Sequence, residues 1–374
     1  MRLERTKTVF ILGAGTSVHC RVPVMKDFLD EAYRLRRYTQ VDLDREAFDL
    51  VFEAITVLNA VYAKSSLELR NVESVFAAFE MAALFGRLGE LGADRIQRLV
   101  PALKKVIIET IEATQLFRVA PQVFQESTGT VLKKHIAPSV EYEAFADLIK
   151  DLAVAGHDVA VFTFNYDVGV DFALQQQPLS YASALEEDPE NVRVELLKLH
   201  GSLNWAQCPQ CKKVSIKPLR TVPPVAEMGE YSANLRPSRG IRDIHCPGNE
   251  REEPFIVPPT WSKSEHYSAI SPVWRRAAQR LGEAENIFII GYSLPDTDHF
   301  FRYLYALGTM GPSRVERLYV FNPDRTTDQR YQQLLGPIAK ERYCLNPEDG
   351  RDANPGTFGS AIRFLDAEFS TATQ

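Results

Sequence analysis

The sequence of 374 residues has few cysteines, no long apolar run and no excess of basic residues. Five scattered cysteines are too few for a disulfide framework, which is typical of a protein from a reducing compartment. The apolar run at 9–12 is too short for a signal-peptide core, and no segment approaches a membrane span. The net charge of −6 provides no broad basic face. We therefore expect a cytoplasmic protein that binds neither a membrane nor nucleic acid directly.

The composition is that of an ordinary globular protein, with 45% apolar and 25% charged residues. Short apolar runs alternate with helical patterns along much of the chain. Helices are expected at 24–35 and near 142–155, and strands at 9–12, 159–164, 194–199, 286–291 and 318–321. This alternation predicts an α/β fold with a Rossmann-like parallel sheet covered by helices on both faces.

Two segments depart from this alternation. The segment 41–138 has a helical pattern, in which Val72, Phe76 and Phe79 share one face behind Asn71 as an N-cap. We find no strand-like run in it and predict a large all-helical insertion. The segment 205–254 is rich in proline, cysteine and charge, and we expect a small separate module there. The main domain then comprises 1–40, 139–204 and 255–374.

The stretch FILGAGTSVHC, which starts at Phe10, resembles a phosphate-binding loop. A strand, the glycines Gly13 and Gly15, and a helix would turn free backbone N–H groups toward an anion. The same glycines also suit a tight turn in any α/β protein, so the loop alone leaves both interpretations open. Val18 replaces the third glycine of a dehydrogenase loop. No strand ending in Asp or Glu follows about 20 residues later, which disfavours a dehydrogenase.

Polar residues follow three other expected strands. Asn165 and Asp167 lie in FTFNYD, His200 lies in LKLHGSLNW, and Gly291 and Ser293 lie in IFIIGYSLPDTD. Ligands of open α/β sheets bind outside the carboxyl ends of the strands, so these groups are expected to converge on one pocket. Taken singly, each also has a structural explanation, such as a helix cap or a turn histidine.

As a set, these motifs resemble the sirtuin family, and more closely its bacterial branch of NAD-cleaving effectors of antiphage defence. GAGTS, NYD, HG, GYSL and FNPD match the family's motifs in the family's order. The resemblance implies a sirtuin-type fold and a bound NAD. The implied contacts are Gly13, Ala14, Gly15 and Ser17 with the pyrophosphate, Asp167 with the nicotinamide carboxamide, Asn165 and His200 with the nicotinamide ribose, and Ser293, beside Gly291, and Asn322 with the adenosine half.

Two departures from deacylating sirtuins favour hydrolysis over deacylation. Phe164 stands where those enzymes carry a glutamine, and Pro258 and Pro259 replace a segment that pairs with an acyl-lysine peptide. Proline cannot donate ladder hydrogen bonds to such a peptide. We therefore predict an NAD+ hydrolase that releases nicotinamide and ADP-ribose. The alternatives are an NAD-dependent protein deacylase and a non-catalytic sensor of NAD or ADP-ribose.

Cleavage of the nicotinamide–ribose bond builds positive charge on the ribose while water approaches the anomeric carbon. Asn165 is expected to orient the water or the ribose, because its amide both donates and accepts. His200 is expected to accept or position a ribose hydroxyl proton.

The cysteine module offers an incomplete metal site. Cys208 and Cys211 have the Cys-x-x-Cys spacing of a metal-binding pair, and Cys246 supplies a third sulfur. Asn249 occupies the place of a fourth ligand. His245, directly beside Cys246, is an awkward substitute. We therefore expect a poor site that holds zinc only sub-stoichiometrically.

An unrestrained NAD hydrolase would drain its host, so we expect activation by a partner during abortive infection. The resemblance implies a translocating ATPase or an Argonaute-type protein as that partner, and a homo-oligomer. The segment 41–138 is suited to subunit or partner contacts.

Overall fold

The computed structural model describes residues 6–38, 41–59, 67–126, 129–185, 192–219, 232–241, 245–246, 251–257, 264–295, 298–311, 313–347 and 355–371. A seven-stranded parallel sheet forms its centre, with the strand order β13-β12-β11-β1-β4-β6-β5. Its strands are β1 (Lys7–Leu12), β4 (Asp158–Thr163), β5 (Tyr181–Ala182), β6 (Val194–Lys198), β11 (Asn286–Ile290), β12 (Arg317–Phe321) and β13 (Tyr343–Leu345). The predicted α/β class and parallel sheet are confirmed. The two short edge strands, β5 and β13, were not predicted.

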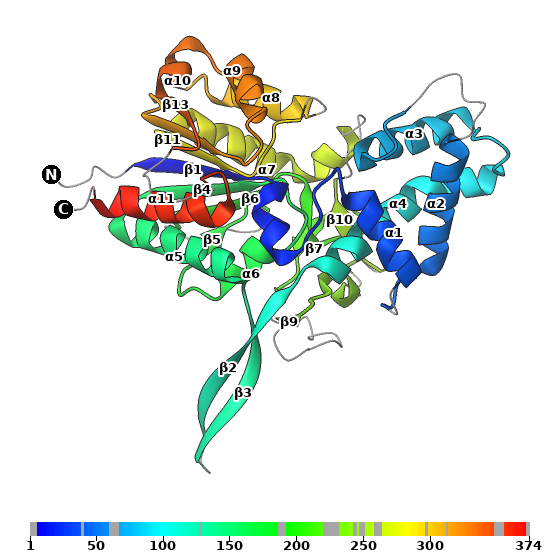
Figure 1. Cartoon of the computed structure of the whole chain (residues 1–374), viewed down its shortest axis with the longest axis horizontal. Coiled ribbons are helices and arrows are strands. Elements are labelled where there is room, and N and C mark those ends of the chain that lie inside the picture. Colours follow the sequence, from blue (N-terminus) through cyan, green and yellow to red (C-terminus); the bar gives the residue numbers. More distant parts are fainter. Residues whose placement is uncertain are drawn as a thin grey trace.

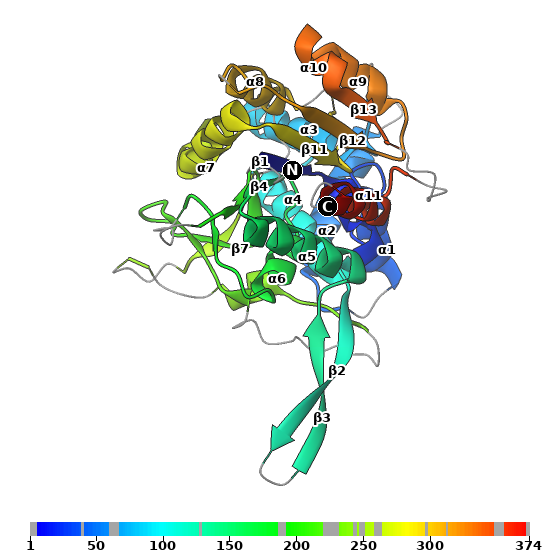
Figure 2. The same ribbon diagram turned by 90° about the vertical axis from the view of Figure 1, so that its left-hand side faces the viewer.

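Strand β1 shows why helices cover both faces of the sheet. Its side chains point alternately to opposite faces, and nearly all of them are buried. Phe10 packs in one hydrophobic cluster with Phe145 of α5, whereas Ile11 packs in a second cluster with Val273 of α7. One face is covered by α5 (Val140–Ala155), α6 (Gly169–Gln175) and α11 (Phe358–Thr371), and the other by α7 (Ser264–Glu283), α8 (His299–Gly308), α9 (Thr327–Leu334) and α10 (Pro337–Arg342) (Figures 1 and 2).

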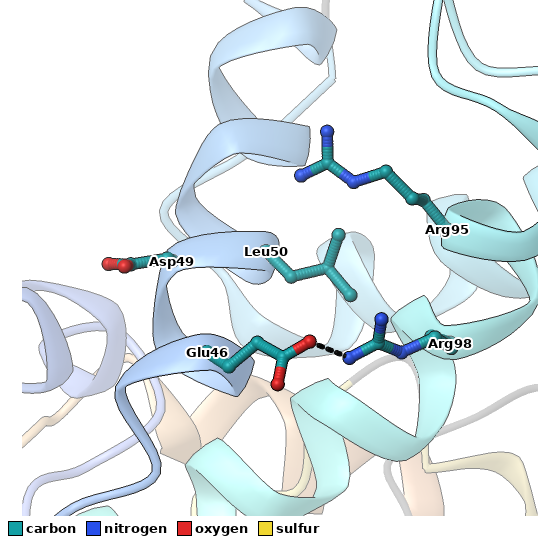
Figure 3. A pocket seen from close by; sticks show the side chains of 5 residues that line it. All are labelled: Glu46, Asp49, Leu50, Arg95 and Arg98. Carbon is teal, nitrogen blue, oxygen red and sulfur yellow. Dashed lines mark hydrogen bonds and ion pairs between the residues drawn. The ribbon is translucent and has the colours of Figure 1, made fainter.

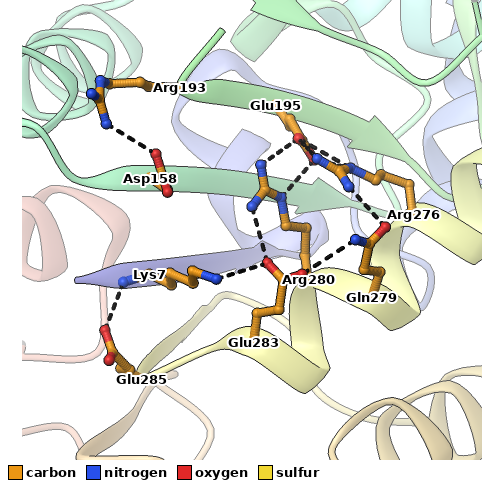
Figure 4. A network of polar contacts seen from close by, with 9 residues as sticks. All are labelled: Lys7, Asp158, Arg193, Glu195, Arg276, Gln279, Arg280, Glu283 and Glu285. Atoms are coloured by element: carbon orange, nitrogen blue, oxygen red, sulfur yellow. Dashed lines mark hydrogen bonds and ion pairs between the residues drawn. The ribbon is translucent and has the colours of Figure 1, made fainter. Parts of the chain in front are cut away.

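Helix α7 is held to the sheet by a buried charge network (Figure 4). Glu195 on β6 is almost fully buried and accepts hydrogen bonds from Arg276 and Arg280 of α7. Burial alone would raise the pKa of Glu195, but the hydrogen bonds from the two guanidinium groups outweigh it and lower that pKa. The network fixes the helix that covers β1 and β6.

A helical block follows β1 and the short 3-10 helix η1 (Ala14–Cys20). It contains α1 (Phe28–Tyr38), α2 (Arg45–Leu58), α3 (Val72–Phe85) and α4 (Ala93–Thr114), and it lies beside the sheet (Figure 1). The predicted N-cap is confirmed, because the Asn71 side chain accepts a hydrogen bond from the N–H of Glu73.

The prediction that 41–138 is all helical is wrong. After α4 the chain forms a hairpin of β2 (Phe117–Glu126) and β3 (Gly129–Ala137), which projects from the body of the molecule (Figures 1 and 2). Sequence periodicity missed it because Pro121 and several polar residues interrupt the apolar alternation. Antiparallel backbone pairing from Arg118 with Ala137 to Glu126 with Gly129 defines this hairpin.

The segment 205–254 forms two structures. One is the antiparallel sheet β10-β7-β8, which consists of β7 (Gly201–Gln207), β8 (Val214–Ile216) and β10 (Glu253–Ile256). By contrast, β9 (Ser232–Ala233) pairs with β2, and η3 (Pro237–Gly240) hydrogen-bonds to α4. Among the described residues, no helix has the length and apolar character that a membrane crossing requires.

Candidate functional site

The carboxyl ends of the central strands carry the residues that the sequence analysis selected. Gly13 follows β1, Asn165 lies just beyond β4, His200 lies between β6 and β7, and Gly291 and Asn322 follow β11 and β12. Strand β1 lies between β4 and β11. The sheet continues from β1 through β4 and β6 on one side and through β11, β12 and β13 on the other, so the strand order reverses at β1. This switch point is where open α/β sheets bind ligands.

The glycine loop packs directly on the end of β11. A Cβ on Gly15 would lie 2.8 Å from the Cα of Gly291, which has a left-handed φ of +64°. The N–H of Gly13 donates to the carbonyl of Ile290 at 3.0 Å, and that of Gly15 donates to Gly291 at 2.9 Å. These two N–H groups are therefore not free to meet a phosphate, contrary to the expectation from the sequence. Close backbone packing explains why both positions are glycine.

Ser17 joins the glycine loop to the end of β4. Its buried hydroxyl lies 2.6 Å from Oδ2 of Asp167, 2.8 Å from the hydroxyl of Tyr142 and 3.0 Å from Nδ2 of Asn165. An ionised carboxylate only accepts, so the single proton of Ser17 goes to Asp167, and Tyr142 must donate to Ser17. Burial and the nearby Asp167 raise the pKa of Tyr142 well above its usual value, which keeps this donor protonated.

Asn165 uses its amide nitrogen to hold the loop. Nδ2 lies 3.0 Å from the carbonyl of Gly13, 3.1 Å from the hydroxyl of Thr16 and 3.0 Å from that of Ser17. Two N–H groups thus face three acceptors of the loop. Any contact of Asn165 with a ligand or a water falls to its amide oxygen.

Gln115 belongs to the same network, although no sequence motif indicates it. It caps the end of α4 and is 1% exposed, and its Nε2 donates to Oδ1 of Asp167 at 3.0 Å. It lies in the segment that was assigned to a separate insertion, 52 residues before its partner. Local patterns do not report such long-range contacts.

His200 lies beside an aromatic cluster. Its ring contacts Phe164 edge-on, with the ring centroids 5.1 Å apart, and its carbonyl accepts a hydrogen bond from Val257. Phe164 stacks on Tyr292 at 4.5 Å and meets Phe301 edge-on. Phe164 is therefore 8% exposed and packed in the hydrophobic core.

The remaining candidates have contacts of their own. Ala14 is half-buried at the start of η1. Ser293 is exposed, and its carbonyl accepts a hydrogen bond from Arg330. Asn322 is buried, and its side-chain oxygen accepts the N–H of Asp324 in a local turn. These contacts do not connect Ser293 and Asn322 to the Ser17 network.

The cysteine module brings together four metal-binding side chains, which corrects the expectation of an incomplete site. One ligand atom each from Cys208, Cys211, His245 and Cys246 lies within 4.8 Å of the others. Nδ1 of His245 is 3.4 Å from both Cys211 and Cys246. Asn249 lies outside the described residues. Three sulfurs and one imidazole form a donor set that suits tetrahedral zinc.

A surface cavity of about 310 Å³ lies in the helical block, between α2 and α4 (Figure 3). Its lining residues are Glu46, Asp49, Leu50, Arg95 and Arg98. Arg98 pairs with Glu46, and Arg95 pairs with Glu53. The charges of both arginines are thus balanced by carboxylates of α2, and the cavity is separate from the strand ends.

Comparisons with known proteins give likenesses only to solved structures. No protein-family model and no curated protein matches the chain. A structure described as a Sir2 homologue in complex with NAD is 15% identical, with a TM-score of 0.41, 99% of this chain covered and 91% of that one. A structure from work on the mechanism and regulation of Sir2 enzymes is 14% identical, with a TM-score of 0.43 and coverages of 98% and 94%. Sir2 bound to an acetylated peptide is 13% identical, with a TM-score of 0.37 and coverages of 97% and 93%. At these identities and TM-scores the likeness decides nothing about the activity of this chain.

Proposed function

We propose that the chain hydrolyses NAD+ to nicotinamide and ADP-ribose at the carboxyl ends of β1 and β4. The observation that carries the proposal is the buried network in which Ser17, Asn165 and Asp167 hold the glycine loop against the end of β4. The same residues form the set whose motifs resemble those of NAD-cleaving sirtuins. A structural role alone requires neither a buried carboxylate nor three polar side chains at a topological switch point.

In the proposed reaction, water adds to the anomeric carbon of the nicotinamide ribose as the bond to the nicotinamide nitrogen breaks. Nicotinamide leaves as a neutral molecule, and one proton is released from the water. The amide oxygen of Asn165 accepts a hydrogen bond from that water or from the ribose, because its nitrogen is used by the loop. His200 accepts or positions the proton of a ribose hydroxyl.

Asp167 is assigned to the nicotinamide carboxamide, and Ala14, at the half-buried start of η1, to the pyrophosphate. Gly15 beside it allows close approach of the ligand, although its own N–H is bound to the carbonyl of Gly291. Asp167 accepts three hydrogen bonds, from Ser17, Gln115 and the N–H of Gly169. A carboxylate offers about four acceptor sites, so one is left for an amide of the ligand. Ser17 then serves as the support of Asp167, with Gly13 and Gly291 closing the loop behind it. Ser293 and Asn322 are assigned to the adenosine half.

Peptide deacylation is the less favoured activity. Phe164, in the place of a polar glutamine, is packed against Tyr292 and Phe301 in the core. Pro258 and Pro259, the other departure, lie outside the described residues. Hydrolysis needs no peptide partner and agrees with both departures.

We further propose that a partner controls this activity, since free NAD hydrolysis would deplete the host. The sequence resemblance implies an abortive-infection effector that works as a homo-oligomer, beside a translocating ATPase or an Argonaute-type protein. The helical block α1–α4 is the surface we assign to such contacts.

Zinc is proposed for the cysteine module. Cys208, Cys211, His245 and Cys246 would hold it as a closed structural site, in which the metal cross-links two distant parts of the module and takes no part in the reaction.

The proposal is tested by incubating the purified chain with NAD+ for hours, with and without an acetylated peptide. Nicotinamide and ADP-ribose in equal amounts without peptide are expected. Acetyl-ADP-ribose formed only with peptide would indicate a deacylase. Binding of NAD+ by the parent without release of nicotinamide in either condition would indicate a sensor.

A further inference from the structure

We infer that Gln115, at the end of α4, is a positioning residue that orients Asp167 and couples the helical block to the nicotinamide end of the site. This inference rests on the proposed function, because it concerns the carboxylate assigned to the nicotinamide carboxamide. The contact crosses between two parts of the chain that the sequence separates: Gln115 ends the fourth helix of the block, and Asp167 follows the central strand β4.

The geometry defines what Gln115 supplies. Its Nε2 lies 3.0 Å from Oδ1 of Asp167, and both side chains are almost fully buried, at 1% and 2% exposure. An ionised carboxylate cannot donate, so the amide must present its nitrogen and not its oxygen. Oδ2 is held by Ser17, so donors from two different parts of the chain fix the two oxygens of the carboxylate. Oδ1 also accepts the N–H of Gly169 at 2.9 Å, so loss of Gln115 leaves that oxygen with one backbone donor and removes the side-chain donor that comes from the helical block.

The backbone of Asp167 is fixed separately. Nζ of the buried Lys198 lies 2.6 Å from the carbonyl of Asp167 and 2.6 Å from Oδ2 of Asp171. The main chain at Asp167 therefore remains in place without Gln115. What Gln115 adds is the orientation of the carboxylate, which is the part that a ligand would meet.

The last turn of α4 is itself held from the 232–241 segment. The side-chain amide of Asn234 lies 2.7 Å from the carbonyl of Gln115 and 3.1 Å from that of Ala113. The buried carboxylate of Glu112 accepts hydrogen bonds from both the N–H and the hydroxyl of Ser238. The Asn234 contacts satisfy carbonyls that the end of a helix leaves without partners, and the Ser238 contacts hold the side chain of Glu112. A shift of α4 or of this segment moves Gln115 and therefore reaches Asp167.

Two substitutions separate this role from simple packing. Gln115→Met keeps the approximate volume and removes the donor. Gln115→Glu replaces the donor by a group that donates only when protonated, and it places two carboxylates about 3 Å apart, which raises the pKa of one of them. Gln97→Met is the matched control, because Gln97 lies on the same helix, is exposed, and reaches only the carbonyl of Ala83.

The experiment measures NAD cleavage and ADP-ribose binding for the parent and the three variants between pH 5 and pH 8.5. Gln115→Met is expected to lose about 10- to 100-fold in kcat, the scale of one hydrogen bond to a charged group. Affinity for ADP-ribose should be unchanged, because that ligand lacks nicotinamide. Activity of Gln115→Glu, as a ratio to the parent, should be highest at low pH and fall as the pH rises. The titratable groups around Asp167 are Lys198, Asp171, His19, Tyr142 and Cys20, and taking the ratio at each pH cancels their contribution.

The outcomes separate the two claims. A parent that neither cleaves nor binds NAD refutes the proposed function, and the inference falls with it. A parent that cleaves NAD, with Gln115→Met as active as Gln97→Met, overturns the inference alone. A pH-independent ratio for Gln115→Glu also overturns it, and this measurement decides the question if Gln115→Met does not fold.

Discussion

Replacement of Ser17 by alanine tests the buried network most simply, because one atom serves three partners. The change removes the donor to Asp167, the acceptor of Tyr142 and one acceptor of Asn165. A hydrogen bond to a charged group contributes about 1.5–3 kcal/mol, and a buried hydroxyl that loses its partner costs about 1–3 kcal/mol. The second cost is at the low end for Tyr142, because its hydroxyl also interacts with the side chain of Thr16. Asp167 keeps two donors, from Gln115 and Gly169. We therefore expect the free energy of unfolding to fall by an amount near the lower end of the sum of these two ranges. The expected decrease in the free energy of unfolding is about 3–4 kcal/mol.

Urea denaturation with an unchanged m-value measures this decrease. Ser293→Ala is the matched control, because Ser293 is an exposed serine at the end of the neighbouring strand β11. Its unfolding free energy should change by less than about 0.5 kcal/mol. A Ser17→Ala variant that loses under about 1 kcal/mol would show that the network does not stabilise the loop as described.

Three other predictions concern the reaction, the metal and the response to acid. Asn165→Ala or His200→Ala should leave the fold intact and reduce NAD cleavage by about a hundredfold or more in a nicotinamide-release assay; a folded double variant with parental activity would remove both residues from the site. Elemental analysis should find one zinc per chain, lost in Cys211→Ser and His245→Ala but kept in Cys344→Ser, whereas a metal-free parent would contradict the assignment. The pKa of Glu195 is lower in the folded chain than in the unfolded chain. Its ionised side chain therefore stabilises the fold at neutral pH, and this stabilisation is lost as the pH falls through the folded-state pKa. The unfolding midpoint of Glu195→Gln should depend less on pH below about 5 than that of the parent.

The central sheet was predictable because its strands are buried on both faces. The cores of β1, β4, β6, β11 and β12 each appeared in the sequence as a short apolar run followed by a polar or glycine-containing motif. Such runs follow from burial alone and need no knowledge of distant contacts. The edge strands β5 and β13 carry too few residues to give a pattern, and the β2–β3 hairpin is defined by backbone pairing that an interrupted apolar alternation does not reveal.

The site was predictable only in part, for a related reason. Motifs placed Asn165, His200 and Gly291 at strand ends, since a strand and the residue after it are neighbours in sequence. The partners of those residues are distant: Gln115 and Tyr142 reach the Ser17 and Asp167 pair from other elements. His245 was set aside because adjacent ligands are unusual in sequence motifs, yet the fold brings it to Cys211, 34 residues earlier.

Release of nicotinamide from NAD+ by the purified chain tests the central claim most directly. The assay uses NAD+ labelled in the nicotinamide ring and contains no peptide. The incubation is long enough to detect the low rate expected without an activating partner, and Asn165→Ala gives the background. We expect nicotinamide and ADP-ribose in equal amounts from the parent, at least about a hundredfold above that variant. Release that does not exceed the variant's, together with no measurable binding of NAD+, would contradict it.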